Sequence, residues 1–350
     1  MKADNSSPDR IVPDLTRREL FRTVGLATGG TMLLGLPKFL GGWTSEAEAA
    51  GAPGLASSMR AALELDGIFV GFLDFVEGGN AFADIVPEAV GANMIQRTRP
   101  GPVRFEDIVI EVPLGDDAKL MINWVTEVLT KNPVPRNGVI RFVDISSIEV
   151  KRLEFSNALL TEVTLPASDG GSEDAARLLL RIIPQSTRLL GGTGNKLQSS
   201  IVPKVTKRRA IRGYFRFNVQ GLENACSRIS KVDSIVATRS VAGSAVDRDR
   251  LKRSAPGVLD CSMVRITLPE ADAGPFYTWF DETVVKGKPG SERAGLLEWL
   301  DSTMRTVVAS VQLGGLGIVR YAPEPFRAGV EQKIALVRVD MYCESISLKL

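Results

Sequence analysis

The sequence predicts a mainly β protein that contains two tandem domains of one kind, each with a packed helix. Three observations support this fold class. Apolar and polar residues alternate through residues 136–184, this stretch recurs 157 residues further along, and each copy has one helix-like segment around a tryptophan. Internal repeats of this length decide the architecture of a chain.

The alternation marks strands that bury one face. Leu153 and Phe155 lie on one side of the pattern, and Arg152 and Glu154 lie on the other. A period of two residues is typical of a half-buried strand. We expect a turn at 156–158. The strands that follow it alternate in the same way, through Leu159, Val163 and Leu165 and then Leu178, Leu180 and Ile182.

The repeat indicates a tandem duplication. Its matched pairs include Arg136 with Arg293, Gly138 with Gly295, Asp144 with Asp301 and Pro166 with Pro323. The opening strands of the two copies match through Phe72 and Phe215. The predicted domains are residues 53–190 and 213–350, with a linker at 191–212.

Both predicted helices surround a tryptophan. The first is expected at 118–131, around Trp124, and Asn132-Pro133 would end it. The second is expected at 275–286, around Trp279, with Gly287 as its stop. Both tryptophans are predicted to anchor the core rather than to contact a ligand.

The glycines and the lysine of the linker suggest a phosphate-binding loop, but the spacing of these residues argues against one. Gly191–Lys196 lacks the GxxxxGK[ST] pattern, because Leu197 follows the lysine. The basic run at 204–212 is predicted to form a solvated or intersubunit face. Aromatic residues that could stack on bases are missing from it, so a nucleic-acid partner is not expected. Gly314–Gly317 is predicted to be a β turn rather than a dinucleotide loop.

Composition argues against an enzyme. The 350 residues include no histidine, which removes the commonest general base and metal ligand. Cys226, Cys261 and Cys343 lack the spacing of a zinc site. They form either three free thiols or one disulfide and one thiol. No catalytic, metal or cofactor site is predicted.

The N-terminal 52 residues resemble an export signal and leader. Arg17 and Arg18 precede the apolar pair Leu20 and Phe21, which is the order of a twin-arginine signal. A modestly apolar run at 23–36 follows, too short and glycine-rich to span a bilayer stably.

The predicted signal ends in small residues. Ala47 and Ala49 have the Ala-x-Ala spacing of a cleavage site, and residues 50–52 offer a second one. An amphipathic N-terminal helix with a chance Arg-Arg is the alternative. The signal predicts an exported protein that is periplasmic, on the cell surface or extracellular, with the export machinery as a partner.

The order of elements resembles a known family. Phe72–Gly78, Arg99–Leu114, Trp124 and Glu149–Leu190 look like the tube protein of contractile phage tails, and equally like the ring protein of type VI secretion. The resemblance implies two tail-tube-like β-barrel or sandwich domains, with strands that line a ring around a channel. Family members usually have one such domain and form hexamers, so two fused domains would form a trimer that acts as a pseudo-hexamer.

The resemblance predicts a structural protein that assembles with itself. We expect rings, tubes or fibres outside the cytoplasmic membrane, with other tail-like proteins as further partners. Two alternatives stay open: an exported monomeric binding module of the envelope, and a hub or adaptor of a phage-tail-like injection system.

Overall fold

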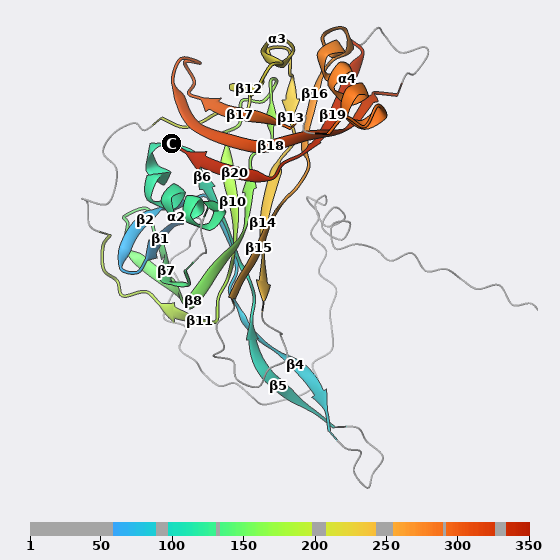
Figure 1. Cartoon of the computed structure of the whole chain (residues 1–350). Helices are drawn as coiled ribbons and strands as arrows, with labels where there is room; N and C mark the ends of the chain where they lie inside the picture. The colour runs from blue at the N-terminus through green and yellow to red at the C-terminus, as the bar shows by residue number, and fades with distance from the viewer. Residues whose placement is uncertain are drawn as a thin grey trace, which may run out of the picture. The chain divides into compact units, whose positions relative to one another are not determined.

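The computed structural model describes residues 59–88, 97–130, 134–197, 208–242, 255–289, 292–325 and 334–350. The fold is mainly β, as the alternation predicts, with short helices between strands. We call β1–β11 with α2 the first half and β12–β20 with α3 and α4 the second half (Figure 1).

The strands of the first half are β1 (Arg60–Leu65), β2 (Ile68–Leu73), β3 (Phe75–Gly78), β4 (Ala81–Pro87), β5 (Thr98–Phe105), β6 (Ile108–Pro113), β7 (Arg136–Val143), β8 (Glu149–Leu165), β9 (Ser168–Asp169), β10 (Arg177–Ile183) and β11 (Ser186–Gly191). A short 3-10 turn, η1 (Asp116–Ala118), leads into helix α2 (Lys119–Thr130).

The strands of the second half are β12 (Phe215–Val219), β13 (Lys231–Val232), β14 (Ile235–Ala242), β15 (Ala255–Cys261), β16 (Val264–Pro269), β17 (Arg293–Leu300), β18 (Val307–Pro323), β19 (Leu336–Tyr342) and β20 (Ser345–Lys349). Its helices are α3 (Glu223–Cys226), η2 (Glu270–Asp272), α4 (Gly274–Phe280) and the π-helical turn η3 (Asp281–Val285).

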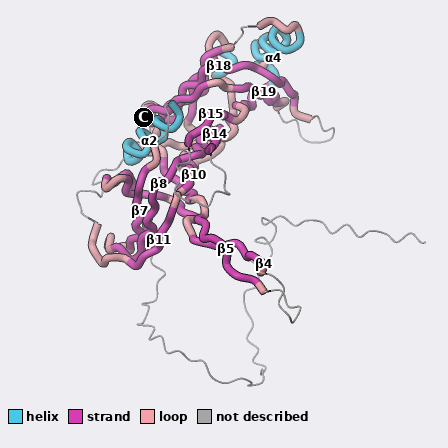
Figure 2. Tube along the Cα trace, turned by 60° about the horizontal axis from the view of Figure 1, so that its bottom comes forward, coloured by secondary structure: helices cyan, strands magenta, loops and turns pink. Residues whose placement is uncertain are grey.

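Within the described residues the strands form three sheets. A 10-stranded sheet has the order β2-β1-β7-β8-β10-β6-β3, with β11 and β14 also on β8. An 8-stranded sheet has the order β12-β17-β18-β19-β16-β13-β9, with β20 on β18. Strands β4 and β5 pair only with each other and project as a separate ribbon (Figures 1 and 2).

The two halves share strand registers. Ile140 of β7 faces Leu63 of β1, and Leu297 of β17 faces Phe217 of β12. The same agreement holds for the other strand pairs. In the first half, Leu180 lies between Val163 and Ile110, and in the second half Val339 lies between Tyr321 and Ile266. In the same way, Leu189 lies opposite Leu153, and Leu348 lies opposite Val311.

These registers correct two sequence matches. Val163 corresponds to Tyr321, so the counterpart of Pro323 is Leu165 and not Pro166. Because β12 pairs with β17 as β1 pairs with β7, the counterpart of β12 is β1 and not the strand that contains Phe72. Phe72 and Phe215 therefore do not occupy corresponding positions. Apolar alternation alone could not distinguish β1 from β2, since both strands carry it.

The predicted turns at 156–158 and 314–317 were wrong. Both segments lie inside single strands of 17 residues, β8 and β18. Asn157 has φ 51° and Gly315 has φ 64°, and the pairing of each strand shifts at this point. A residue with positive φ makes a bulge that bends a strand. The bend lets β8 pair first with β7 and β11 and then with β10 and β14.

The core is continuous between the halves. Helix α2 buries Met121, Trp124, Val125 and Val128, as its apolar face predicts, and Trp279 of α4 is also buried. Fully burying one such aliphatic side chain contributes about 1.5–3 kcal/mol. Buried side chains of both halves belong to one cluster, and residues 56–350 form one compact unit.

Candidate assembly interface

Strand β14 of the second half completes a sheet of the first half. It pairs antiparallel with β8, placing Ile235 opposite Leu165 and Ala237 opposite Val163. Its other edge pairs with β15, so the β14–β15 hairpin extends the first sheet by two strands. Val163 is only 1% exposed beneath this hairpin, and Leu259 of β15 packs against the core. We call this contact between the halves the internal joint.

A buried polar contact also crosses the internal joint. The indole Nε1 of Trp299 donates a hydrogen bond of 2.9 Å to Oγ of Ser168, and both residues are fully buried. An indole N–H that lost this partner would carry its full desolvation cost. The contact therefore ties β17 to β9 in a single arrangement.

The chain that joins the halves is also fastened to the first half. Ala210 is buried, and its backbone exchanges hydrogen bonds with Leu114 and Ala176. Arg208 forms an ion pair with Asp116 at 3.2 Å, with both side chains about half exposed. The described end of the basic run thus lies against the protein's own backbone.

Helix α2 forms the other side of the internal joint. It lies beside the C-terminal strand β20 (Figure 1), and Thr126 Oγ1 donates a 2.9 Å hydrogen bond to the carbonyl of Leu348. Arg239 of β14 caps the helix, because its Nη2 and Nε donate to the Val128 carbonyl at 2.7 and 3.1 Å. That carbonyl is among the last four of α2, which lack helical partners.

Each of the two surfaces that meet in the internal joint has an exposed counterpart in the other half: the β4–β5 ribbon corresponds to the β14–β15 hairpin, and the β18 edge corresponds to the β8 edge. In the first half, Phe82 and Val103 of the β4–β5 ribbon are each 44% exposed, although Leu259, the counterpart of Val103, is partly buried. In the second half, the edge of β18 beyond the bulge has no strand partner other than β19 among the described residues. Val319 on this edge is 39% exposed.

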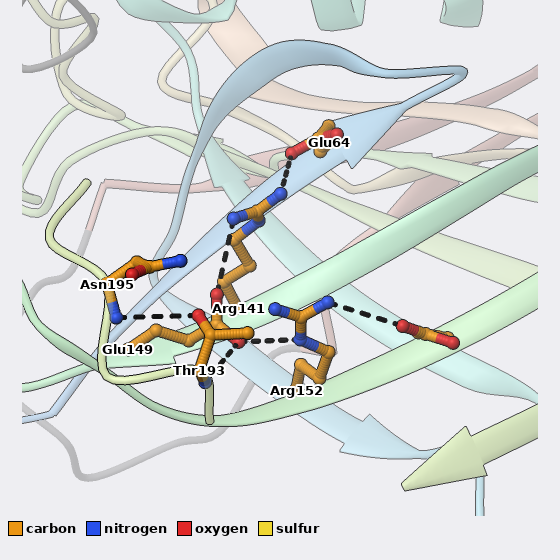
Figure 3. A network of polar contacts seen from close by, with 7 residues as sticks. Glu64, Arg141, Glu149, Arg152, Thr193 and Asn195 are labelled. Atoms are coloured by element: carbon orange, nitrogen blue, oxygen red, sulfur yellow. Dashed lines mark hydrogen bonds and ion pairs between the residues drawn. The ribbon is translucent and has the colours of Figure 1, made fainter. Parts of the chain in front are cut away.

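A buried carboxylate holds the start of the predicted linker. The Glu149 side chain is 1% exposed and accepts from Arg152 at 2.6 Å and from Arg141 at 3.2 Å (Figure 3). The backbone N–H of Thr193 also donates to Glu149. A buried charge needs this degree of pairing, since leaving it unpaired would cost several kcal/mol. Residues 192–195 are therefore held against β8.

Charge differs between the matching sheet faces of the two halves. In the second half, Asp340 lies within 3.0–3.9 Å of three arginines, Arg265, Arg320 and Arg338. In the first half, Arg181 takes the position of Asp340 and pairs with Glu162 and Asp107. The named side chains thus give this face an excess of positive charge in the second half and an excess of negative charge in the first half.

All three cysteines are free thiols. Burial raises the pKa of Cys226 and of Cys261 to about 11, and burial also raises the pKa of Cys343. Thiols with raised pKa values are poor nucleophiles at neutral pH. Among the described residues, no group of three or more metal-binding side chains lies together, and no helix is long and apolar enough to cross a membrane.

The residues predicted for the export signal lie outside the described residues: Arg17, Arg18, Leu20, Phe21, Ala47 and Ala49. The sequence did not single out Arg239 or Glu149. Each is one charged residue in an alternating strand, and such residues normally face solvent. Glu149 is buried because the loop at 192–195 packs against it, and Arg239 caps helix α2 because the two halves pack together.

No protein-family model and no curated sequence matches the chain. Solved structures that align include the tube-terminating cap of the anti-feeding prophage, with 16% identity, a TM-score of 0.36 and coverage of 43% of this chain and 98% of that one.

Two further structures align at similar levels. The sheath–tube complex of an extracellular contractile injection system, PVC, has 15% identity, a TM-score of 0.34 and coverage of 38% of this chain and 88% of that one. Hcp1 from Flavobacterium johnsoniae has 20% identity, a TM-score of 0.25 and coverage of 38% and 96%.

Proposed function

We propose that this protein is a structural subunit that assembles with itself into rings, by repeating its internal joint between molecules. The observation that carries the proposal is the pairing of β14 with β8. The counterpart of β14 is β4, and the counterpart of the β8 edge is the β18 edge. In the described residues neither of these has a partner from the other half.

The register of the internal joint predicts which residues would meet between molecules. Ala237 faces Val163 in the internal joint, and the corresponding residues are Ala81 and Tyr321. Strand β4 of one molecule would therefore pair antiparallel with β18 of the next around these residues. Strand addition of this kind covers exposed sheet edges, which are otherwise prone to aggregate.

Repetition of one head-to-tail contact produces either a closed ring or an open filament. If the joint between molecules has the geometry of the internal joint, every half occupies an equivalent position. The tail-tube resemblance then favours six positions, supplied by three chains. The shared registers support an origin by tandem duplication, which would explain why one chain supplies two positions.

We also propose that the protein acts outside the cytoplasmic membrane. The order of Arg17, Arg18, Leu20 and Phe21 supports export by the twin-arginine route. Replacing both arginines by lysine should leave the full-length chain in the cytoplasmic fraction of a host that has this route. Equal export of the variant would contradict the proposal.

The ring is tested on the purified full chain by light scattering and negative-stain electron microscopy. We expect a concentration-dependent assembly with a central hole and a mass that is a multiple of three chains. A monomer at every accessible concentration would refute self-assembly.

A substitution tests whether the β4–β5 ribbon makes the contact. Phe82→Asp should prevent assembly without unfolding the monomer, because Phe82 is already 44% exposed. Ile145→Asp is the matched control, since Ile145 is 71% exposed in the β7–β8 turn, away from both edges. Assembly of Phe82→Asp at the concentration needed by the wild type would exclude this ribbon from the contact.

A further inference from the structure

The two halves contain the same pocket. In the first half, it is lined by residues of β7, β8 and β11, including Gly138, Phe155 and Ser186. In the second half, the corresponding residues Gly295, Leu313 and Ser345 line a pocket in β17, β18 and β20. The first pocket has a volume of about 400 Å³, which is enough for side chains and not only for water.

The second-half pocket has an additional wall that comes from the other half. Leu129 and Thr130, at the end of helix α2, line it together with the residues of β20. Leu129 is 5% exposed there. The helix also covers the neighbouring strand, because Leu348 of β20 is 1% exposed and its carbonyl accepts the hydrogen bond from Thr126. An apolar helix end therefore forms one wall of this pocket within the chain.

The first-half pocket has no such helix end among its lining residues. Leu189 of β11, which has the position of Leu348, is 56% exposed. The matching helix end of the second half is exposed as well. Counting from the buried tryptophans Trp124 and Trp279, the counterparts of Leu129 and Thr130 are Val284 and Val285, at 45% and 65% exposure.

Both surfaces carry charged side chains that are already paired within the chain. The first-half pocket is lined by Glu64, Asp66, Glu154 and Arg188, and its three carboxylates form ion pairs with Arg141, Arg136 and Arg152. Lys286 and Lys288, which follow Val285, form ion pairs with Asp281 and Glu282. Exposed apolar side chains, and not charge, therefore favour docking between the two surfaces.

We propose that Val284 and Val285 of a second copy of this chain form a wall of the first-half pocket, as Leu129 and Thr130 do in the second-half pocket. This inference rests on the proposed ring and identifies the helix that closes the contact between molecules. Docking would bury Leu189 beneath η3.

The experiment uses the full chain with two readouts. Val285→Asp should raise the concentration needed for assembly at least tenfold, while Ile145→Asp assembles as the wild type does. Circular dichroism checks that the Val285→Asp monomer is folded, which its 65% exposure predicts.

Cross-linking locates the contact independently. Asp281 and Leu189 are the counterparts of Thr126 and Leu348, which touch in the internal joint. When Asp281→Cys and Leu189→Cys chains are mixed and oxidised, a covalent dimer should form, and neither variant should form it alone.

The outcomes separate the two proposals. If the wild type forms rings, yet Val285→Asp assembles normally and the mixed chains give no dimer, the docking is wrong and the ring stands. If the wild type is monomeric at every concentration, both are wrong. A pocket that binds another protein and not a second copy would give the first of these results.

Discussion

Arg239→Leu is expected to weaken the internal joint at the end of helix α2. The substitution keeps an apolar stem and removes the guanidinium, which donates twice to the Val128 carbonyl and once to Gly257 at 3.0 Å. A hydrogen bond to a charged group contributes about 1.5–3 kcal/mol. A cation at a helix C-terminus contributes about 0.3–1 kcal/mol. Since the two donors at Val128 share one acceptor, the expected loss is about 2–3 kcal/mol.

Urea unfolding of the full chain, followed by tryptophan fluorescence, measures this loss. The melting temperature should fall by roughly 4 °C or more. Amide hydrogen exchange should accelerate in the last turn of α2, because the carbonyl that Arg239 caps lies there. Arg228→Leu is the control, since Arg228 is an exposed arginine. If Arg239→Leu and Arg228→Leu both stay within about 0.5 kcal/mol of the wild type, the guanidinium does not hold the halves together.

Three other substitutions test separate features. Glu149→Gln should lower the unfolding free energy by about 2–4 kcal/mol, because two arginines lose a buried charged partner. Proteolysis near residue 193 should accelerate, and an unchanged rate would show that Glu149 does not hold residues 192–195 against β8. Gly138→Ala should lower the melting temperature more than Gly295→Ala does. At residue 138 the new Cβ would lie 2.8 Å from a backbone carbonyl oxygen, whereas the close contact at residue 295 is to the end of a leucine side chain, which can move. Equal decreases in melting temperature would contradict this reasoning. Burial raises the pKa of Cys226 to about 11, so on raising the pH the unfolded state loses this proton first, and the unfolding free energy should fall between pH 9 and 11. Cys226→Ala should make this decrease with pH less steep. An equally steep decrease in the variant would exclude the thiol as its cause.

The charge difference between the halves bears on the proposed assembly. A ring made of identical domains would repeat one surface at every position. Here Arg181 replaces Asp340, so anionic and cationic surfaces would alternate around the proposed ring. If the proposed ring forms, a chain with two divergent halves would have a property that a single-domain ring lacks, namely threefold variation of charge around six positions.

The sequence by itself determined the local elements. Alternation placed the strands from Arg136 to Leu165, and the apolar face around Trp124 placed helix α2, because burial of one face imposes a period that is visible in any window of the chain. The match between the segments that begin at Arg136 and Arg293 also revealed that β7 has a counterpart in β17.

Only the tertiary structure decided which edges meet. Backbone donors and acceptors are the same at every residue, so alternation does not say that β14 pairs with β8. For the same reason it could not separate a bulge at Asn157 from a turn, since either one interrupts the pattern. The roles of Arg239 and Glu149 depend on groups contributed by other segments of the chain, and these come together only when the halves pack.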